Sequence, residues 1–321
     1  MRSKTIPHII KSQQFSPESL QKLFYKVSNI QTQFKNPAGR VVLKRKLAGK
    51  LLFNIFYEPS TRTRLSFASA AHHMGMQVIG TEAANQFSSA IKGETLEDTI
   101  KVLCSYYPDA IVLRHQTEGS AERASLVSTV PIINAGDGAG QHPTQALLDV
   151  YTIHNRLKTL NNLTVLVGGD LRHGRTVRSL VYLLSKFKGT NFIFCSPETL
   201  KMLPDIKDHL AENSIPYLEI FSDLSKVISL ADVVYWTRIQ KERIEDHSNI
   251  EEMMNEFVID KAMMALMKPY SVLMHPLPRN MEISTEVDAD IRSAYFDQAE
   301  NGLYVRMALL EMLLKDTFKV L

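Results

Sequence analysis

One short stretch of the sequence carries an unusual density of groups that could bind an anion. Ser60, Thr61, Arg62, Thr63 and Arg64 follow one another without interruption and offer three hydroxyl groups and two guanidinium groups. Both kinds of group donate hydrogen bonds to phosphate oxygens, and the charge-assisted bonds are about twice as strong as neutral ones. The stretch lacks the G-x-x-x-x-G-K-[ST] pattern of a nucleotide-binding P-loop. The sequence therefore predicts a site for a phosphate on some other ligand.

The segments on either side would place this stretch at the start of a helix. Residues 51–56 form an apolar run of strand length, and residues 65–75 are rich in alanine and end at a glycine, as a helix does. The first N–H groups of a helix lack intrahelical partners and carry partial positive charge, so such a turn binds anions readily. A simpler alternative is that Ser60 or Thr61 caps the helix while both arginines are solvated. The polar residues at later strand ends favour the anion site.

Length and composition describe an ordinary globular protein. The chain has 321 residues, of which 45% are hydrophobic and 22% charged, and we expect two domains of about 150 residues. The chain has 37 basic and 34 acidic residues, so the two charges nearly balance, and no block of basic residues occurs. We therefore expect no nucleic-acid partner. We expect no membrane segment either, because no apolar span of about 20 residues is present. The N-terminus lacks the apolar core of a signal peptide.

No metal or organic cofactor is expected from the sequence. The two cysteines, Cys104 and Cys195, each lie in an apolar run, and we expect them to be buried in a protein of the reducing cytoplasm. Cysteine and histidine residues do not recur at the spacing of zinc ligands. Residues 168–170 resemble part of a dinucleotide loop, but the G-x-G-x-x-G spacing is missing, so a nicotinamide cofactor is not expected.

Apolar strands alternate with helices along the chain, which predicts an α/β fold of two doubly wound parallel-sheet domains joined by helices. We expect a first domain at residues 1–143, a second at 144–294, and a C-terminal helical segment, 295–321, that folds back on the first. The expected strands are 51–56, 77–80, 110–113, 131–134, 163–170, 192–195, 233–236 and 271–274. The expected helices include 16–34, 65–75, 95–106, 144–153 and 177–186.

Polar residues gather where these strands end. Ligands of open parallel sheets lie beyond the carboxyl ends of the strands, so residues that follow different strands meet at one edge. The candidates in the first domain suit a phosphate beside a carbonyl group, and they are Ser60, Thr61, Arg62, Thr63, Arg114, His142 and Gln145. Those in the second suit carboxylates, because guanidinium groups match carboxylate geometry. They are Arg175, Arg238, Gln240 and Arg243.

Six motifs follow one another along the chain from about residue 50 to residue 320. They are S-T-R-T-R at Ser60, R-H-x-x-E-G at Arg114, H-P-T-Q at His142, G-R-T at Gly174, T-R-x-Q-K-E-R at Thr237 and H-P-L-P-R at His275. In this order they resemble the catalytic chains of the aspartate carbamoyltransferase family. The last two motifs select aspartate, since the ornithine enzymes carry a cysteine in a corresponding H-C-L-P motif. No cysteine lies near His275.

That resemblance implies a carbamoyl transfer. The carbamoyl group of carbamoyl phosphate would pass to the amine of L-aspartate, giving N-carbamoyl-L-aspartate and phosphate at an early step of de novo pyrimidine biosynthesis. No covalent nucleophile is needed, which agrees with the lack of a Ser-His-Asp or Cys-His pattern. Orientation and electrostatics would supply much of the rate. The departing phosphate could take the proton of the amine, since no dedicated side-chain base is evident.

The resemblance also implies roles for individual residues. The phosphate would be held by Ser60, Thr61, Arg62, Thr63 and Arg114. The carbonyl oxygen would be polarised, in an oxyanion-type role, by Thr63, Arg114 and His142. The carbamoyl NH2 would donate to Gln145 and to the backbone carbonyls of Pro276 and Leu277. The two carboxylates of aspartate would be bound by Arg175, Arg238 and Gln240.

An assembly is implied as well. Ser88 and Lys92 would lie on a loop that enters the neighbouring subunit's site, so that the catalytic unit is a homotrimer with shared active sites. A regulatory chain or a dihydroorotase could associate with it. Composition alone favours a solvated turn at Lys92, because charged residues at turns are usually exposed. The chain departs from the family at His173, where a tyrosine often precedes Gly-Arg-Thr, so contacts near the aspartate would differ there.

Two other functions remain open. A carbamoyltransferase for another amine would need a second-domain pocket less suited to two carboxylates, and Arg238 with Gln240 argues against it. A catalytically inactive subunit that serves as an assembly scaffold should have lost phosphate ligands. All of the expected ligands are present in this chain.

Overall fold

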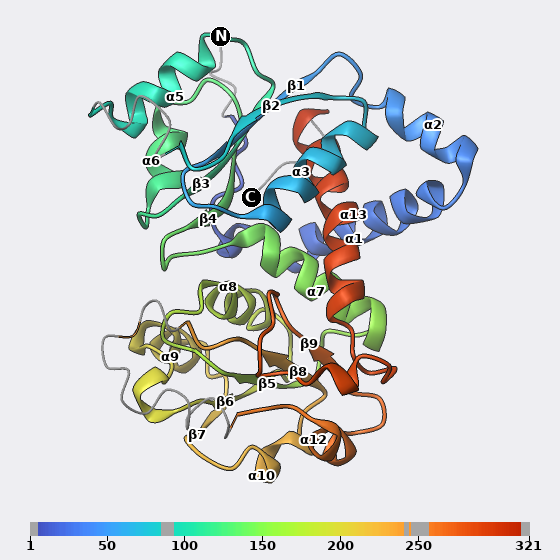
Figure 1. Ribbon diagram of the computed structural model, residues 1–321, viewed down its shortest axis with the longest axis vertical. Coiled ribbons are helices and arrows are strands. Elements are labelled where there is room, and N and C mark those ends of the chain that lie inside the picture. The colour runs from blue at the N-terminus through green and yellow to red at the C-terminus, as the bar shows by residue number, and fades with distance from the viewer. Residues whose placement is uncertain (1–5, 85–92, 241–243, 245–256, 316–321) are drawn as a thin grey trace. The chain divides into compact units, whose positions relative to one another are not determined.

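The computed structural model describes residues 6–84, 93–240, 244 and 257–315. The chain divides into two compact units, Met1–Leu147 with Asn301–Leu321 (unit 1) and Leu148–Glu300 (unit 2). Each unit holds a parallel sheet with helices around it, so the expected fold class is confirmed (Figure 1). The expected domain boundaries fall at the starts of helices α7 and α13, whereas the observed division falls inside both helices.

Unit 1 is built on a four-stranded sheet of order β2-β1-β3-β4. Its strands are β1 (Leu51–Phe56), β2 (Gln77–Thr81), β3 (Ala110–His115) and β4 (Ile132–Asp137), and all of them are parallel. Successive residues of β1, β3 and β4 are buried, which requires cover on both faces of the sheet. Strand β2 lies at the edge and is largely exposed.

The helices of unit 1 begin where the sequence supplies a cap. Ser16 accepts from the N–H of Ser19, and Pro17 occupies the first position of α1. Thr95 caps α5 in the same way, through the N–H of Asp98. The helices are α1 (Pro17–Phe34), α2 (Pro37–Arg45), α3 (Thr61–His73), α5 (Leu96–Cys104), α6 (Ser120–Val127) and parts of α7 (Pro143–Leu157) and α13 (Tyr295–Leu314).

Buried ion pairs connect three of these helices. Glu311 of α13 accepts from Lys26 of α1 and from Lys46, the residue that ends α2, at 3.1 Å in each case. The Glu311 side chain is only 6% exposed, so its charge depends on these partners. The residues of α13 that belong to unit 1 are therefore fixed to its N-terminal helices.

Unit 2 is built on a five-stranded sheet of order β7-β6-β5-β8-β9, again with all strands parallel. The strands are β5 (Thr164–Gly168), β6 (Asn191–Cys195), β7 (Tyr217–Ile220), β8 (Val233–Trp236) and β9 (Val272–Met274). The helices are α8 (Arg175–Leu184), α9 (Pro204–Glu212), α10 (Ser225–Ile228) and α12 (Lys261–Leu266). Short 3-10 turns lie at Ser12–Gln14 in unit 1 and at Glu198–Leu200 and Thr285–Val287 in unit 2.

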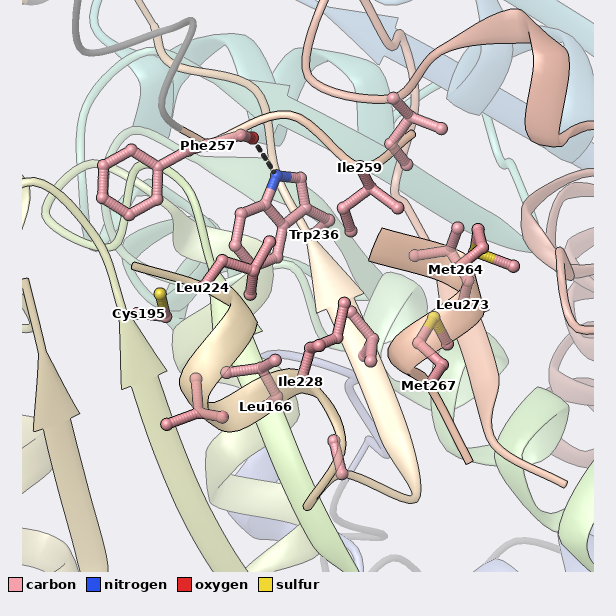
Figure 2. Close-up of a cluster of buried hydrophobic side chains, with 14 of the residues drawn as sticks. Leu166, Cys195, Leu224, Ile228, Trp236, Phe257, Ile259, Met264, Met267 and Leu273 are labelled. Carbon is pink, nitrogen blue, oxygen red and sulfur yellow. Dashed lines mark hydrogen bonds between the residues drawn. The ribbon is translucent and has the colours of Figure 1, made fainter. Parts of the chain in front are cut away.

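The buried Trp236 packs within a hydrophobic cluster in the core of unit 2 (Figure 2). Trp236 packs among Leu166, Leu224 and Leu273, and its Nε1 donates to the carbonyl of Phe257 at 2.9 Å. A Cβ added at Gly168 would lie 1.9 Å from the indole ring, so only glycine fits at the end of β5. The indole of Trp236 thus packs directly on the backbone at the end of β5.

The expected burial of Cys104 and Cys195 is confirmed, and both are free thiols. Within the described ranges, no helix combines the length and the apolar character needed to cross a membrane. The same ranges contain no group of three or more histidine, cysteine, aspartate or glutamate residues that could hold a metal ion.

Candidate active site

The predicted site residues lie at the same kind of place in both sheets. The strand order of unit 1 changes direction between β1 and β3, and that of unit 2 changes direction between β5 and β8. Ligands of open parallel sheets bind beyond the strand carboxyl ends at such switch points. We call the two sets the first half-site (Ser60, Thr61, Arg62, Thr63, Arg114, His142 and Gln145) and the second half-site (Arg175, Arg238, Gln240, Pro276 and Leu277).

The first half-site is centred on the start of α3. The helix begins at Thr61, four residues before the expected start at 65, so the polar stretch forms its first turn. Thr61 and Arg62 are exposed while Thr63 is buried. Ser60 occupies the N-cap position, but among the described residues its hydroxyl accepts no capping hydrogen bond from the helix. The side-chain capping by Ser60 that the simpler alternative assumed is therefore not observed among these residues.

Arg64 does not take part in the first half-site. Its Nη2 pairs with Glu82 Oε2 at 2.9 Å, and its carbonyl accepts from Asn54 Nδ2 at 3.0 Å. Residues two apart on a helix point to nearly opposite sides, so Arg62 and Arg64 cannot both face one ligand. The expectation that both guanidinium groups of the stretch serve the anion is wrong for Arg64.

Arg114 is fixed at the end of β3 by contacts on both sides. Its side chain is 11% exposed, Nη2 pairs with Glu58 Oε2 at 3.2 Å, and Nη1 donates to the carbonyl of Ala135 at 3.2 Å. The N–H of Tyr57 donates to the Arg114 carbonyl at 2.8 Å, which ties β3 to the loop after β1. Sequence reasoning missed Glu58, although an acid two residues before S-T-R-T-R was a visible signal.

His142 and Gln145 lie at the start of α7. The His142 side chain is buried, its Nδ1 lies 3.4 Å from Thr144 Oγ1, and its carbonyl accepts from the N–H of Gln145 at 3.0 Å. The loop before them is held by Asp137, whose Oδ1 accepts from the N–H of Gln141 at 2.9 Å. Two predicted residues therefore share one helical turn, and a buried aspartate that the sequence analysis overlooked fixes their position.

His115 is a structural residue of the turn after β3. Its Nδ1 accepts from the N–H of Thr117 at 3.0 Å and lies 2.9 Å from Ser120 Oγ. Burial lowers the pKa of His115, and the nearby Arg123 adds to this effect. A neutral imidazole is the form that can accept from the backbone, so the ring closes the turn after β3.

One buried carboxylate joins two loops of the second half-site. Asp170, which follows β5, is fully buried, and its Oδ1 accepts from the N–H of His173 at 3.0 Å while Oδ2 accepts from the N–H of Gln240 at 3.2 Å. His173 Nδ1 also lies 3.2 Å from both oxygens. The loop that leads to Arg175 and the loop that carries Arg238 are thus tied to one group. Sequence reasoning missed this role.

The ends of β5 and β8 are joined directly as well. The buried Thr237 donates from Oγ1 to the carbonyl of Gly168 at 3.0 Å, and its N–H donates to the same carbonyl at 2.9 Å. Arg175 is the first residue of α8, Arg238 follows Thr237, and both are partly exposed. The predicted carboxylate ligands are therefore side chains at rigid strand and helix ends.

The third contribution to the second half-site is the backbone after β9. His275 is buried, and Pro276 and Leu277 are half-buried. Arg279 of the same motif turns away from them, because its Nη2 pairs with Asp288 Oδ2 at 2.6 Å and its Nη1 donates to Tyr295 Oη at 3.0 Å. The remaining predicted residues, Ser88, Lys92 and Arg243, lie outside the described residues.

Comparisons with known proteins agree with this geometry. Residues 7–155 match the family model described as aspartate/ornithine carbamoyltransferase, carbamoyl-P binding domain, and residues 161–313 match the model described as aspartate/ornithine carbamoyltransferase, Asp/Orn binding domain. The chain belongs to the aspartate/ornithine carbamoyltransferase family. The family resemblance drawn from the six motifs is thereby confirmed.

Individual relatives of this carbamoyltransferase-family chain cover nearly all of it. It is 48% identical over 307 residues to the chloroplastic aspartate carbamoyltransferase of Arabidopsis thaliana, a match that covers 95% of this chain and 77% of that protein. The aspartate carbamoyltransferase catalytic subunit of Clostridium botulinum is 44% identical over 308 residues, covering 96% and 97%. The crystal structure of aspartate transcarbamoylase from Trypanosoma cruzi in complex with carbamoyl phosphate and aspartate is similar with a TM-score of 0.87, 37% identity and 95% coverage of each chain.

Proposed function

We propose that this chain is an aspartate carbamoyltransferase, which transfers the carbamoyl group of carbamoyl phosphate to the amine of L-aspartate. The products are N-carbamoyl-L-aspartate and phosphate, at an early step of de novo pyrimidine biosynthesis. The observation that carries the proposal is that each sheet presents, at its own switch point, the side chains that suit one of the two substrates. Relatives of this name match over nearly the whole chain.

The first half-site is suited to carbamoyl phosphate. The phosphate would accept from the first turn of α3, where backbone N–H groups, hydroxyls and the exposed Arg62 are close together. Arg114 is already fixed by Glu58 and Ala135, so little conformational freedom is lost when the substrate binds. Ser60, Thr61 and Thr63 complete the proposed phosphate ligands.

The second half-site is suited to aspartate. Its two carboxylates would bind Arg175, Arg238 and Gln240, and Asp170 supports the loops of all three residues. The support matters because a guanidinium fork recognises a carboxylate only in a narrow range of orientations. An acceptor with a single carboxylate, such as ornithine, would leave one of these donors without its partner.

The chemistry would proceed by direct attack of the amine. The nitrogen of aspartate forms a bond to the carbonyl carbon, and the carbonyl oxygen gains negative charge, which Thr63, Arg114 and His142 would stabilise. The tetrahedral species collapses as the bond to the phosphate oxygen breaks, and the departing phosphate takes the proton of the amine. Gln145 and the carbonyls of Pro276 and Leu277 would orient the carbamoyl NH2. No covalent intermediate is involved.

The assembly and the location belong to the same proposal. We propose a carbamoyl-phosphate-binding domain at residues 1–143 with 295–321, an aspartate-binding domain at 144–294, and a homotrimer in which Ser88 and Lys92 enter the neighbouring site. The support for the trimer is the family resemblance, and the same resemblance allows a regulatory chain or a dihydroorotase as a further partner. The two free, buried cysteines support a cytoplasmic location.

A carbamoylation assay tests the activity. With carbamoyl phosphate as donor, the enzyme should carbamoylate aspartate and leave ornithine essentially unchanged. Turnover of ornithine, or of neither amine, would contradict the proposal.

Mixed trimers test the sharing of sites. Chains carrying Lys92→Ala should be mixed with chains carrying Arg62→Ala, because a site that draws Arg62 from one chain and Lys92 from another can then be assembled from two intact parts. Partial recovery of activity is expected. Verified mixed trimers without recovery would count against shared sites.

A further inference from the structure

We propose that Glu282 is a positioning residue of this reaction, which acts through His275 to fix the backbone turn at Pro276 and Leu277. The carbonyls of this turn are the proposed acceptors for the carbamoyl NH2, so the inference rests on the proposed function. The inference adds a second requirement to the proposed function. Recognition of the NH2 group would depend on a buried imidazole and a buried carboxylate that contact no substrate.

The imidazole of His275 connects the acid to the turn. The N–H of Leu277 donates to His275 Nδ1 at 2.8 Å, and His275 Nε2 lies 2.9 Å from Glu282 Oε1. A backbone N–H can only donate, so Nδ1 must carry no proton, and the ring proton lies on Nε2 and is donated to Glu282. The carboxylate therefore selects the tautomer that can hold Leu277. The two side chains are 1% and 6% exposed, so both depend on these partners within the protein.

Leu277 needs such an anchor. Its φ of 52° lies in the left-handed region, which leucine rarely adopts. A residue stays in this region only when its surroundings fix it. The hydrogen bond from the Leu277 N–H to His275 is such a restraint. It orients the peptide group between Pro276 and Leu277, which carries the Pro276 carbonyl, and it holds Leu277, whose own carbonyl follows.

Both the acid and the imidazole have a further hydrogen bond that involves a backbone N–H. The N–H of Asn280 donates to Glu282 Oε1 at 3.0 Å, while the N–H of His275 donates to Gln298 Oε1 at 3.0 Å. Burial alone would raise the pKa of Glu282, but the hydrogen bond from His275 and the backbone N–H groups lower it overall. The group is thus a carboxylate at neutral pH, which is the form that accepts from Nε2.

Glu282 also reaches the other loop of the second half-site. It lines a small buried cavity together with Thr237 and Ile239, the two neighbours of Arg238. Glu282 therefore lies next to both loops: the turn at Pro276 and Leu277, and the loop that carries Arg238. The closer connection is to the carbonyls, because the hydrogen bonds run through His275 to Leu277.

Two phosphonates that differ in one group test the inference. Phosphonoacetamide carries an NH2 next to its carbonyl, and 2-oxopropylphosphonate carries a methyl group of similar size there. We expect the wild-type enzyme to bind the amide about tenfold more tightly, since one net hydrogen bond is worth roughly that factor. Titration calorimetry on each variant then reports recognition of the NH2 separately from recognition of the phosphonate.

Four substitutions separate the two ends of the imidazole. His275→Gln keeps a donor near Nε2 but loses the acceptor for Leu277, and Glu282→Ala removes the acid; both should reduce the preference for the amide to about one. His275→Asn keeps an acceptor near Nδ1, and Glu282→Gln keeps an acceptor oxygen, so both should retain part of the preference. The kcat with carbamoyl phosphate should fall in the same order, while the KM for aspartate changes by less than about threefold.

Glu311→Gln is the matched control, because Glu311 is another buried, paired glutamate that lies outside both half-sites. It should lower the melting temperature and leave the preference for the amide unchanged. If His275→Gln does not fold, Glu282→Ala makes the same test. Folded variants that keep the full preference would overturn the inference alone. A wild-type enzyme that carbamoylates no aspartate and binds neither phosphonate would overturn the proposed function and the inference with it.

Discussion

The two half-sites solve the same problem in different ways. The first takes four of its seven residues from one uninterrupted stretch, and the start of α3 sets their directions. The second collects its five residues from the loops after three strands, and buried acids support these loops: Asp170 joins two of them, and Glu282 contacts the third through His275. A contiguous site depends on local helix geometry, whereas a dispersed site depends on buried groups that bind no substrate.

The largest effect should come from the contiguous half-site. Replacing Arg62 with alanine would remove the proposed charge-assisted contact to the phosphate. Such a contact is worth about 1.5–3 kcal/mol in simple cases and more when a site depends on it, so kcat/KM for carbamoyl phosphate should fall by about 100-fold or more. Arg64→Ala is the matched control on the same turn, because its guanidinium is paired with Glu82. It should cost less than about fivefold. Equal losses of kcat/KM in the two variants would contradict the proposal that Arg62 faces the phosphate while Arg64 does not.

The next effect concerns Arg238, a proposed aspartate ligand of the dispersed half-site. Arg238→Ala should raise the KM for aspartate by about 10- to 100-fold, since one guanidinium contact to a carboxylate is lost. The response to carbamoyl phosphate should stay close to normal. A lost phosphate response with an unchanged aspartate response would mean that the two half-sites have been exchanged.

A smaller effect is expected from the acid behind that ligand. Asp170→Asn keeps one acceptor oxygen and replaces the other by an NH2 group, which only donates. One of the two hydrogen bonds, from the N–H of His173 or from the N–H of Gln240, is therefore lost. The kcat/KM for aspartate should fall by about tenfold because both loops are loosened. Binding of phosphonoacetamide, measured by calorimetry, is the control. A variant with a normal aspartate response would show that the loops do not depend on Asp170.

The smallest effect is one of stability in unit 1. Burial alone would raise the pKa of Glu311, but hydrogen bonds from Lys46 and Lys26 lower it overall from its ordinary value of 4.5. Because the folded pKa lies below the unfolded one, the stabilisation is complete above about pH 4.5 and is lost as the pH falls through the folded pKa. Glu311→Gln should therefore lower the melting temperature by about 3 °C at pH 7, and by less near pH 4. A difference that stays constant from pH 7 to pH 4 in scanning calorimetry would contradict this.

Much of the fold follows from the sequence because its signals are local. Apolar runs marked the strands β1, β3, β4, β5, β6, β8 and β9, and the Ser16-Pro17 cap marked the start of α1. Helix α2 and strand β7 escaped prediction, since α2 buries a single residue, Leu43, and β7 is partly exposed at the edge of its sheet. Tertiary contacts, and not local pattern, decide such elements.

The candidate site also has a part that could be predicted from the sequence and a part that could not. The polar side chains could be gathered from their positions after strands, and those among the described residues follow strands that end as expected. The pairing of Glu58 with Arg114 and of Asp170 with Gln240 could not be predicted, because these partners lie 56 and 70 residues apart in sequence. Glu282 lies only seven residues from His275, but no motif of the sequence marks it as the partner of that imidazole. The roles of the individual ligands stay predictions.

The central claim is that one half-site binds the phosphorylated donor and the other binds the dicarboxylate acceptor. A crystal structure with N-(phosphonacetyl)-L-aspartate, which joins both parts in one molecule, tests it most directly. The phosphonate should contact residues 60–63, and the two carboxylates should contact Arg175 and Arg238. A phosphonate bound away from the turn at 60–63, or carboxylates bound away from these arginines, would contradict the claim.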